Sequence, residues 1–212
     1  EDIAMLLHHI AFTPSSRKVR MFLHEKGITV PMLDVADGFA LSSDYTSRYP
    51  HRMVPMLELD DGTQIGEAMA ICRYFETLHP DPPLMGTDPR DRATVEMWER
   101  RAYNEGMGAV EEVFRNSHPL MVDRGLPGTD QPVPQIPALV ERGQARFARF
   151  LDKFDAQLAE RHFVAGERFT VADIATLCVI DFGRWCQIEV PDRCTHLRRW
   201  YADVSARPGA AA

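Results

Sequence analysis

The segment from Met53 to Tyr74 limits what this chain can fold into more than any other part of it. It predicts a short strand that opens at Val54–Pro55, a turn at Asp61–Gly62, a second strand, and a helix that begins at Glu67. Proline has no N–H to give a neighbouring strand, so this end of the sheet must face something else. The Val54–Pro55 bond is a candidate cis peptide, which would turn the Val54 backbone outward, and the helix start adds free N–H groups. We therefore expect a site for an extended peptide that carries a carboxylate.

The first third of the chain alternates between strand and helix patterns. An apolar run at Met5–Ile10 predicts a buried strand, and apolar residues at helical spacing then predict a helix that stops at Gly27. A second strand is expected at Ile28–Val35, and a weak helix or irregular connection at Leu41–Tyr49. With the hairpin and helix described above, these elements predict an α/β domain at residues 1–84.

The rest of the chain reads as helical. Its composition changes at the proline-rich segment His79–Pro83, and we expect a linker at 85–90 followed by an all-helical domain at 91–212. The expected helices cover Arg90–Phe114 and Pro137–Glu160, and two more begin at Thr170 and near Asp192. The proline- and glycine-rich segment Pro119–Pro137 is predicted to be an extended loop, and loops of that length are often functional.

Thr170 and Asp173 have the spacing of a capping box at a helix start. Asp173 could instead be a catalytic acid. Phe169 and Ile174 occupy the flanking staple positions, and the cap of a buried helix is the favoured interpretation.

Composition narrows the class of protein. A net charge of −7 argues against nucleic acid as a partner, and 45% apolar residues are ordinary for a globular protein. The four cysteines are widely spaced, which favours free thiols in a reducing, cytoplasmic setting and predicts no metal site. No run of apolar residues is long enough to span a membrane, so no membrane partner is expected.

Taken in this order and at these distances, the Val-Pro strand, the Glu-Ala-Met-Ala-Ile helix start, the proline-rich linker and the capping motif make the chain resemble a cytosolic glutathione transferase. The resemblance covers nearly the whole chain. The segments F-T-P-S-S-R-K-V-R and C-R-Y-F-E-T-L-H-P look most like a bacterial branch related to the atypical yeast enzymes. The resemblance to the family implies a thioredoxin-like domain joined to a helical domain, usually in a homodimer. Glutathione, the co-substrate, would lie along the first domain and an electrophile between the two.

The resemblance also implies which residues bind glutathione. In the pair Val54–Pro55, the first residue would pair its backbone with the cysteinyl part, and Glu67 would hold the γ-glutamyl end. Ala68 stands where the family has Ser, so a side-chain hydrogen bond of about 1 to 2 kcal/mol is lost while the backbone N–H can still donate. Arg52 falls where some classes place a basic residue for the glycyl carboxylate. It could equally be a surface arginine, with His51 taking that place.

Catalysis in this family stabilises a thiolate, because a free thiol has a pKa of about 8.5 and is mostly protonated at neutral pH. The resemblance places the catalytic hydroxyl at Thr13, counted back from the pair Val19–Arg20, with Ser15 as the second candidate. The β-branch of Thr13 limits its rotation. Ser16 is expected to be the N-cap of the first helix. No cysteine lies in this turn, which disfavours thiol-transfer chemistry.

For the second substrate, the resemblance points to the first long helix. Tyr103, Met107 and Glu111 follow one another at spacings of four, on the face that usually lines the pocket, although such a stripe is more often simple core. Several members of this branch rely on a water held by the helical domain, and the segment Arg115–Pro119, which contains His118, is a candidate to hold such a water. The alternative is a polar helix end in which His118 favours the dipole.

Three functions remain open from the sequence. The chain could conjugate glutathione to a small apolar electrophile, or be a non-catalytic relative that binds or regulates. It could also be a specialised glutathione-dependent lyase, isomerase or peroxidase. Retained Val54, Pro55 and Glu67 favour a working glutathione site, whereas Ala68 keeps the non-catalytic hypothesis open.

Overall fold

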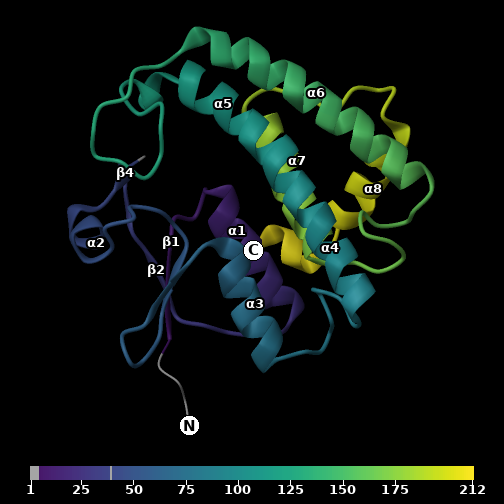
Figure 1. The fold of residues 1–212 in the computed structure, drawn as a ribbon, viewed down its shortest axis with the longest axis horizontal. Coiled ribbons are helices and arrows are strands. Elements are labelled where there is room, and N and C mark those ends of the chain that lie inside the picture. The colour runs from purple at the N-terminus through teal and green to yellow at the C-terminus, as the bar shows by residue number, and fades with distance from the viewer. Residues whose placement is uncertain (1–4, 39) are drawn as a thin grey trace.

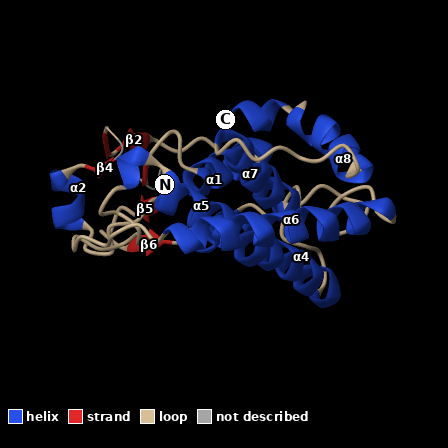
Figure 2. Cartoon of the chain, turned by 90° about the horizontal axis from the view of Figure 1, so that it is seen from above, coloured by secondary structure: helices blue, strands red, loops and turns tan. Residues whose placement is uncertain are grey.

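The computed structural model describes residues 5–38 and 40–212, so the first four residues of the predicted 1–84 domain lie outside it. A small mixed α/β part comes first in the chain, and a larger part made of helices follows (Figures 1 and 2). This is the arrangement predicted from the sequence, an α/β domain followed by an all-helical one. The exact boundaries at 84, 85–90 and 91 stay a prediction.

The N-terminal part is built on a four-stranded sheet in the order β2-β1-β5-β6. Strand β1 (Leu6–His9) pairs in parallel with β2 (Met32–Asp34) and antiparallel with β5 (Met56–Glu58), which pairs with β6 (Gln64–Gly66). Helices α1 (Pro14–Glu25) and α3 (Ala68–Leu78) lie on one side of this sheet, and α2 (Ser43–Arg48) lies on the other (Figure 1). A two-residue pair of strands, β3 (Ala36–Asp37) and β4 (Ala40–Leu41), lies beside them.

The helical part begins with one long helix that changes its winding in the middle. It consists of α4 (Pro89–Arg101), a π-helical segment η1 (Ala102–Met107) and α5 (Gly108–Ser117). The remaining helices are α6 (Pro137–Ala159), α7 (Val171–Trp185) and α8 (Thr195–Ser205), with short 3₁₀ turns η2 (Pro119–Met121) and η3 (Pro208–Ala211). The helices expected from periodicity are therefore present, although the first was predicted as a uniform α-helix.

The π-helical segment allows close packing at one point. A Cβ at Gly106 would lie 2.7 Å from the Val179 side chain of α7 and 2.9 Å from Phe150 of α6, so only glycine fits there. A π-helical turn also shifts the side chains that follow it onto a different face. Residues before and after η1 therefore do not continue one α-helical stripe.

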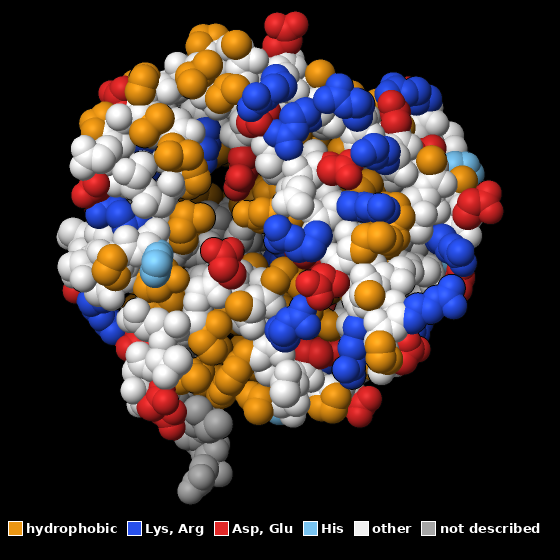
Figure 3. All heavy atoms as spheres, viewed as in Figure 1, with side chains coloured by type: hydrophobic (Ala, Val, Ile, Leu, Met, Phe, Trp, Pro, Cys, Tyr) orange, Lys and Arg blue, Asp and Glu red, His pale blue; other side chains and the backbone are white. Residues whose placement is uncertain are grey.

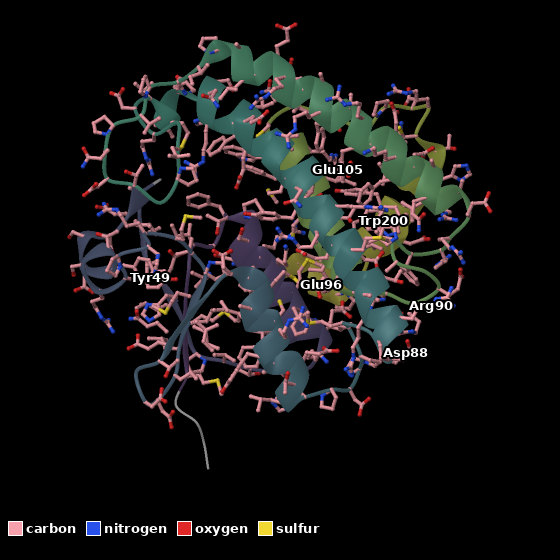
Figure 4. All side chains as sticks on the ribbon, viewed as in Figure 1. Tyr49, Asp88, Arg90, Glu96, Glu105 and Trp200 are labelled. Atoms are coloured by element: carbon pink, nitrogen blue, oxygen red, sulfur yellow. The ribbon has the colours of Figure 1, made fainter. Side chains whose placement is uncertain are left out.

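Helix α7 runs through the middle of the helical part and is almost wholly buried. Its start is the predicted capping box: the Thr170 hydroxyl accepts from the Ala172 N–H, and Asp173 accepts from the Thr170 N–H at 2.9 Å. Asp173 also accepts from the Val164 N–H and from Nε1 of Trp200, which Figure 4 labels within the helical part. Asp173 is thus a structural cap at the centre of the core, as expected.

A buried ion pair ties the two parts together. Lys18 on α1 donates to Glu99 on α4 at 2.7 Å, with only 5% and 0% of the two side chains exposed. Glu96 and Glu105, which Figure 4 labels on the same long helix, instead lie toward its exposed side, where each pairs with a basic side chain. Buried pairs of this kind are costly to break, because the remaining charge has no partner. The α1 helix is therefore fixed against the helical part.

Within the described residues, none of the helices is both long and apolar enough to cross a lipid bilayer.

Candidate functional site

A cavity of about 700 Å³ lies where the two parts meet. Its walls come from the turn before α1, the segment before Pro55, helices α5 and α7, and the loop between α5 and α6. Figure 3 shows it as a hollow bordered mostly by hydrophobic side chains, with acidic and basic ones at the rim. Thr13, Ser15, Arg52, Val54 and Glu111 are the sequence-predicted site residues that line it.

The turn before α1 places the hydroxyls of Thr13 and Ser15 at the cavity, and the two differ in their hydrogen bonds. Thr13 is the N-cap of α1, so the expected Ser16 cap is wrong; Ser16 is buried inside the first turn. The Thr13 hydroxyl donates to the Ile10 carbonyl at 3.0 Å and lies 2.7 Å from the Ser16 hydroxyl. Among the described residues, the Ser15 hydroxyl has no recorded hydrogen bond. Ser15 therefore offers a free donor, whereas Thr13 must first turn away from its partners.

The segment before Pro55 is held so that Val54 faces the cavity. The Val54–Pro55 bond is cis, as predicted. The buried Tyr45 hydroxyl donates to the Met53 carbonyl at 2.6 Å and fixes the chain immediately before it. Arg52 has a left-handed backbone with φ of 54°, and its guanidinium lies 3.9 Å from the Asp130 carboxylate. The Asp130 side chain is exposed and that of Arg52 is half-buried, so this long pair is weak and Arg52 can exchange it for a ligand carboxylate.

Glu67 and Ala68 are not among the residues that line the cavity. Glu67 is the N-cap of α3 with φ of 65°, a conformation that costs a non-glycine residue about 1 to 3 kcal/mol. No side chain caps this helix start, so its first N–H groups are available to a ligand. Burial and the Glu67 charge raise the pKa of Tyr49, which Figure 4 labels in the α/β part. Glu67 is exposed and Ala68 is buried, so the side chain of Glu67 is free to pair with an ammonium group.

The loop between α5 and α6 forms one wall of the cavity. The Gly125 N–H donates to the Val133 carbonyl and the Val133 N–H to the Asp123 carbonyl, both at 2.9 Å, which closes the loop on itself. At its α6 end, Gln135 donates to the carbonyls of Arg115 and His118, which ties the loop to the end of α5. Its tip reaches the α/β part, because a side chain at Gly128 would lie 3.6 Å from the Met53 sulfur. In Figure 1 the loop extends from α5 toward β4.

Of the residues predicted for the second-substrate pocket, only Glu111 lines the cavity itself. Glu111 lines the cavity, whereas Tyr103 and Met107 do not, and Met107 is only 2% exposed. His118 stacks on Trp185, a residue that does line the cavity, at a centroid distance of 5.4 Å. Tyr103 and Glu111 still lie near each other, because the Glu111 charge, after burial, raises the pKa of Tyr103.

Sequence reasoning missed the contribution of α7. Arg17 of α1 donates to Asp181 of α7 at 2.6 Å, and both line the cavity. Tyr201 donates to the other oxygen of Asp181 at 2.5 Å. An acidic residue, Asp181, near the end of a strongly apolar helix is the sequence feature that could have indicated this contribution. Phe182 and Trp185 of the same helix supply aromatic surface to the cavity wall.

The cysteines take no part in this arrangement as nucleophiles. Cys178 lines the cavity but is buried, and burial raises the pKa of its thiol to about 11. All four cysteines of the chain are free. Within residues 5–38 and 40–212, no cluster of three or more His, Cys, Asp and Glu side chains could hold a metal ion.

Two family profiles match the chain. "Glutathione S-transferase, N-terminal domain" covers residues 7–83, and "Glutathione S-transferase, C-terminal domain" covers residues 100–208. Among curated proteins, glutathione S-transferase 2 of Saccharomyces cerevisiae is 29% identical over 96% of this chain and 87% of its own length. FtsZ-localized protein A of Caulobacter vibrioides is 30% identical over 98% of this chain and 89% of its own length.

Solved structures agree in fold and extent. A glutathione S-transferase domain-containing protein of Marinobacter aquaeolei is 34% identical, with a TM-score of 0.84 over 96% of this chain and 98% of its own. A glutathione S-transferase of Methylobacillus flagellatus, solved with glutathione bound, is 26% identical, with a TM-score of 0.80 over 97% and 96%. By both domains and along nearly its whole length, the chain belongs to the glutathione S-transferase family, with a resemblance to the yeast-type members.

Proposed function

We propose that this chain is a glutathione transferase that ionises the glutathione thiol and directs it at a small, largely apolar electrophile. The observation that carries the proposal is the cavity, where the start of α1, the Val54 segment and the aromatic residues of α5 and α7 meet. A helix N-terminus for a thiolate and an apolar wall for an electrophile are what such a reaction needs.

Glutathione would lie along the edge of the α/β part. Val54 would pair its backbone with the cysteinyl unit, and Glu67 would hold the γ-glutamyl ammonium beside the uncapped N-terminus of α3. The Ala68 N–H would donate to the γ-glutamyl carboxylate. Arg52 would take the glycyl carboxylate and release Asp130 of the loop. A relative of the same fold solved with glutathione bound supports glutathione as the ligand.

The thiol would be activated by a hydroxyl at the start of α1. The helix dipole and one donor together can lower a thiol pKa from about 8.5 by about one unit, worth roughly 1.4 kcal/mol. The uncommitted hydroxyl supports Ser15 as that donor, and Thr13 can assist through Ser16, since either hydroxyl can donate across their 2.7 Å separation.

Conjugation of chlorodinitrobenzene, measured together with the pKa of the bound thiol, tests this mechanism. Ser15→Ala and Thr13→Ala are the variants. We expect Ser15→Ala to raise the thiol pKa by about one unit and to slow conjugation about tenfold at neutral pH. If neither substitution raises the pKa of bound glutathione, a hydroxyl is not the activating group.

We further propose a cytoplasmic homodimer without a metal cofactor, as the family resemblance implies. Sedimentation equilibrium would give twice the chain mass. Extensive treatment with a chelator would leave conjugation unchanged.

A non-catalytic binding or regulatory protein is the second candidate. The 30% identity to FtsZ-localized protein A favours keeping this candidate, since the name of that relative describes a localisation and no reaction. Glutathione titration separates the two, because a protein with an inactive site shows no saturable binding. A lyase, isomerase or peroxidase would bind glutathione equally well and would be distinguished by its substrate.

A further inference from the structure

One tyrosine near the start of α3 has no role in the chemistry proposed above. Tyr49, which Figure 4 labels, is the C-cap of α2, and its N–H donates to the Tyr45 carbonyl at 2.8 Å. Its ring packs against the rings of Tyr45 and His51, at centroid distances of 5.8 Å and 5.3 Å. Because Tyr49 is only 7% exposed, this packing fixes where its hydroxyl lies.

The Tyr49 hydroxyl lies against the residue that comes just before the N-cap of α3. A Cβ at Gly66 would be 2.2 Å from the Tyr49 oxygen, which is closer than two such atoms can approach. The hydroxyl therefore occupies the space that a side chain at position 66 would fill. Gly66 ends β6 and is followed directly by Glu67, the N-cap of α3. The absence of a Cβ at Gly66 thus lets Tyr49 reach the start of the helix.

The structure gives this hydroxyl no partner. Within residues 5–38 and 40–212, no hydrogen bond is recorded for the Tyr49 oxygen. The oxygen is also not one of the fully covered side-chain atoms without a partner, so solvent reaches it. Burial and then the Glu67 charge raise the pKa of the phenol, which keeps its proton at neutral pH and is a donor. An unpaired hydroxyl on so buried a side chain needs an explanation, and a ligand supplies one.

The groups around the hydroxyl suit both charges of an α-amino acid. No side chain caps α3, so the N–H groups of its first turn and the Tyr49 hydroxyl are donors for a carboxylate. The exposed Glu67 side chain beside them is an acceptor for an ammonium group. A helix start alone attracts any anion, whereas the acid disfavours an anion that carries no positive charge. The site therefore suits a zwitterion better than a phosphate or a simple carboxylate.

We propose that the Tyr49 hydroxyl donates a hydrogen bond to the α-carboxylate of the γ-glutamyl unit, and that Tyr49 is a specificity-determining residue of the glutathione site. This inference rests on the proposed transferase function and adds a residue to its binding site. Ala68, at the first position of α3, has no hydroxyl to offer this carboxylate. Tyr49 supplies a side-chain donor from the end of α2 instead.

Tyr49→Phe tests the assignment, because it removes the hydroxyl and keeps the ring. Tyr74→Phe, which makes the same change at a half-buried position on α3, is the matched control. Calorimetric titration measures the dissociation constants for glutathione and for two analogues. One is γ-aminobutyryl-cysteinylglycine, which lacks the α-carboxylate, and the other is glutaryl-cysteinylglycine, which lacks the ammonium group. Thermal unfolding of each variant checks the fold.

We expect Tyr49→Phe to raise the dissociation constant for glutathione about tenfold, since a hydrogen bond to a charged group is lost. The analogue without the ammonium group should lose affinity by the same factor. The analogue without the carboxylate should bind the variant and the wild type equally. In conjugation assays KM for glutathione should rise about tenfold while kcat changes less than twofold, because Tyr49 does not line the cavity. Tyr74→Phe should change none of these values.

Three results would overturn the assignment and leave the transferase function intact. The first is an unchanged affinity of Tyr49→Phe for glutathione. The second is an equal loss for the analogue without the carboxylate, which would mean that the hydroxyl acts through the fold. The third is a loss that disappears with the analogue without the ammonium group, which would make the hydroxyl an acceptor for that group. Absence of saturable glutathione binding in the wild type would instead refute the proposed function and this inference with it.

Discussion

Two helices of this molecule begin with a threonine cap, and they use it in opposite ways. At α7, the hydroxyl of Thr170 and the carboxylate of Asp173 are 2% and 0% exposed, and every donor around them is paired. At α1, Thr13 makes no side-chain cap bond to the helix, and Ser15 faces a cavity. The cap is completed by the side chains around it at α7, whereas at α1 the Ser15 hydroxyl faces the cavity without a recorded hydrogen bond among the described residues.

The difference between the two helix starts predicts which substitutions affect stability and which affect the proposed chemistry. Burial raises the pKa of Asp173 to about 6, although the hydrogen bonds from Val164, Trp200 and Thr170 oppose that shift. The α7 cap therefore keeps a carboxyl group in the core at a cost in desolvation. The start of α1 makes fewer internal bonds, so its polar groups can serve a bound thiol. Substitutions at α7 should therefore act on folding, and those at α1 and α3 on glutathione.

The largest effect is expected at α7. Asp173→Ala leaves the N–H groups of Val164, Thr170 and Trp200 without an acceptor in the core, which should lower the free energy of unfolding by about 3 to 5 kcal/mol. Chemical denaturation measures this, with Asp203→Ala on the exposed face of α8 as the control. A loss below about 1 kcal/mol would mean that the capping box does not hold the core together.

At α1 the effect should fall on the thiol. Ser15→Ala should lower kcat/KM about tenfold while changing the free energy of unfolding by less than about 0.5 kcal/mol. Thr13→Ala should instead change kcat/KM little and lower the free energy of unfolding by about 1 kcal/mol, because the Thr13 hydroxyl bonds to Ile10 and Ser16. If Thr13→Ala raises the thiol pKa more than Ser15→Ala does, the roles of the two hydroxyls must be exchanged.

At α3, Glu67→Gln removes the charge proposed to hold the γ-glutamyl ammonium. The dissociation constant for glutathione should rise about tenfold, because a charge-assisted hydrogen bond becomes a neutral one. Calorimetric titration at low salt measures it. Asp61→Asn, in the exposed turn between β5 and β6, is the control. Equal affinities for wild type and Glu67→Gln would place the ammonium elsewhere.

The smallest expected effect is an increase in the affinity for glutathione. Ala68→Ser restores the hydroxyl that the family places at this position, and serine fits where a small side chain is already buried. We expect glutathione to bind about two- to tenfold more tightly, the effect of one added hydrogen bond of about 0.5 to 1.5 kcal/mol. The same titration applies. Weaker binding would show that the γ-glutamyl carboxylate does not approach this side chain.

Local patterns predicted the elements that define the fold. The Val54–Pro55 strand start, the helix after Glu67 and the Thr170 cap each depend on a few neighbouring residues, and each is present. The short strands β3 and β4 were not predicted, because two-residue pairings leave almost no periodic signal.

The second-substrate side of the cavity was harder to predict, for two physical reasons. The π-helical segment η1 breaks the 3.6-residue period on which the Tyr103–Met107–Glu111 face was based. The contributions of Asp181 and of the loop tip depend on packing between segments far apart in sequence, which no local pattern records. The glutathione-binding and catalytic assignments themselves stay predictions.

The pKa of glutathione bound to the wild-type protein is the most direct test of this account. Ultraviolet absorbance of the thiolate, followed against pH at saturating protein, gives it. The account predicts saturable binding and a pKa at least one unit below the free value of about 8.5. Binding with an unshifted pKa, or no binding at all, would contradict the claim that the start of α1 is reserved for a thiolate.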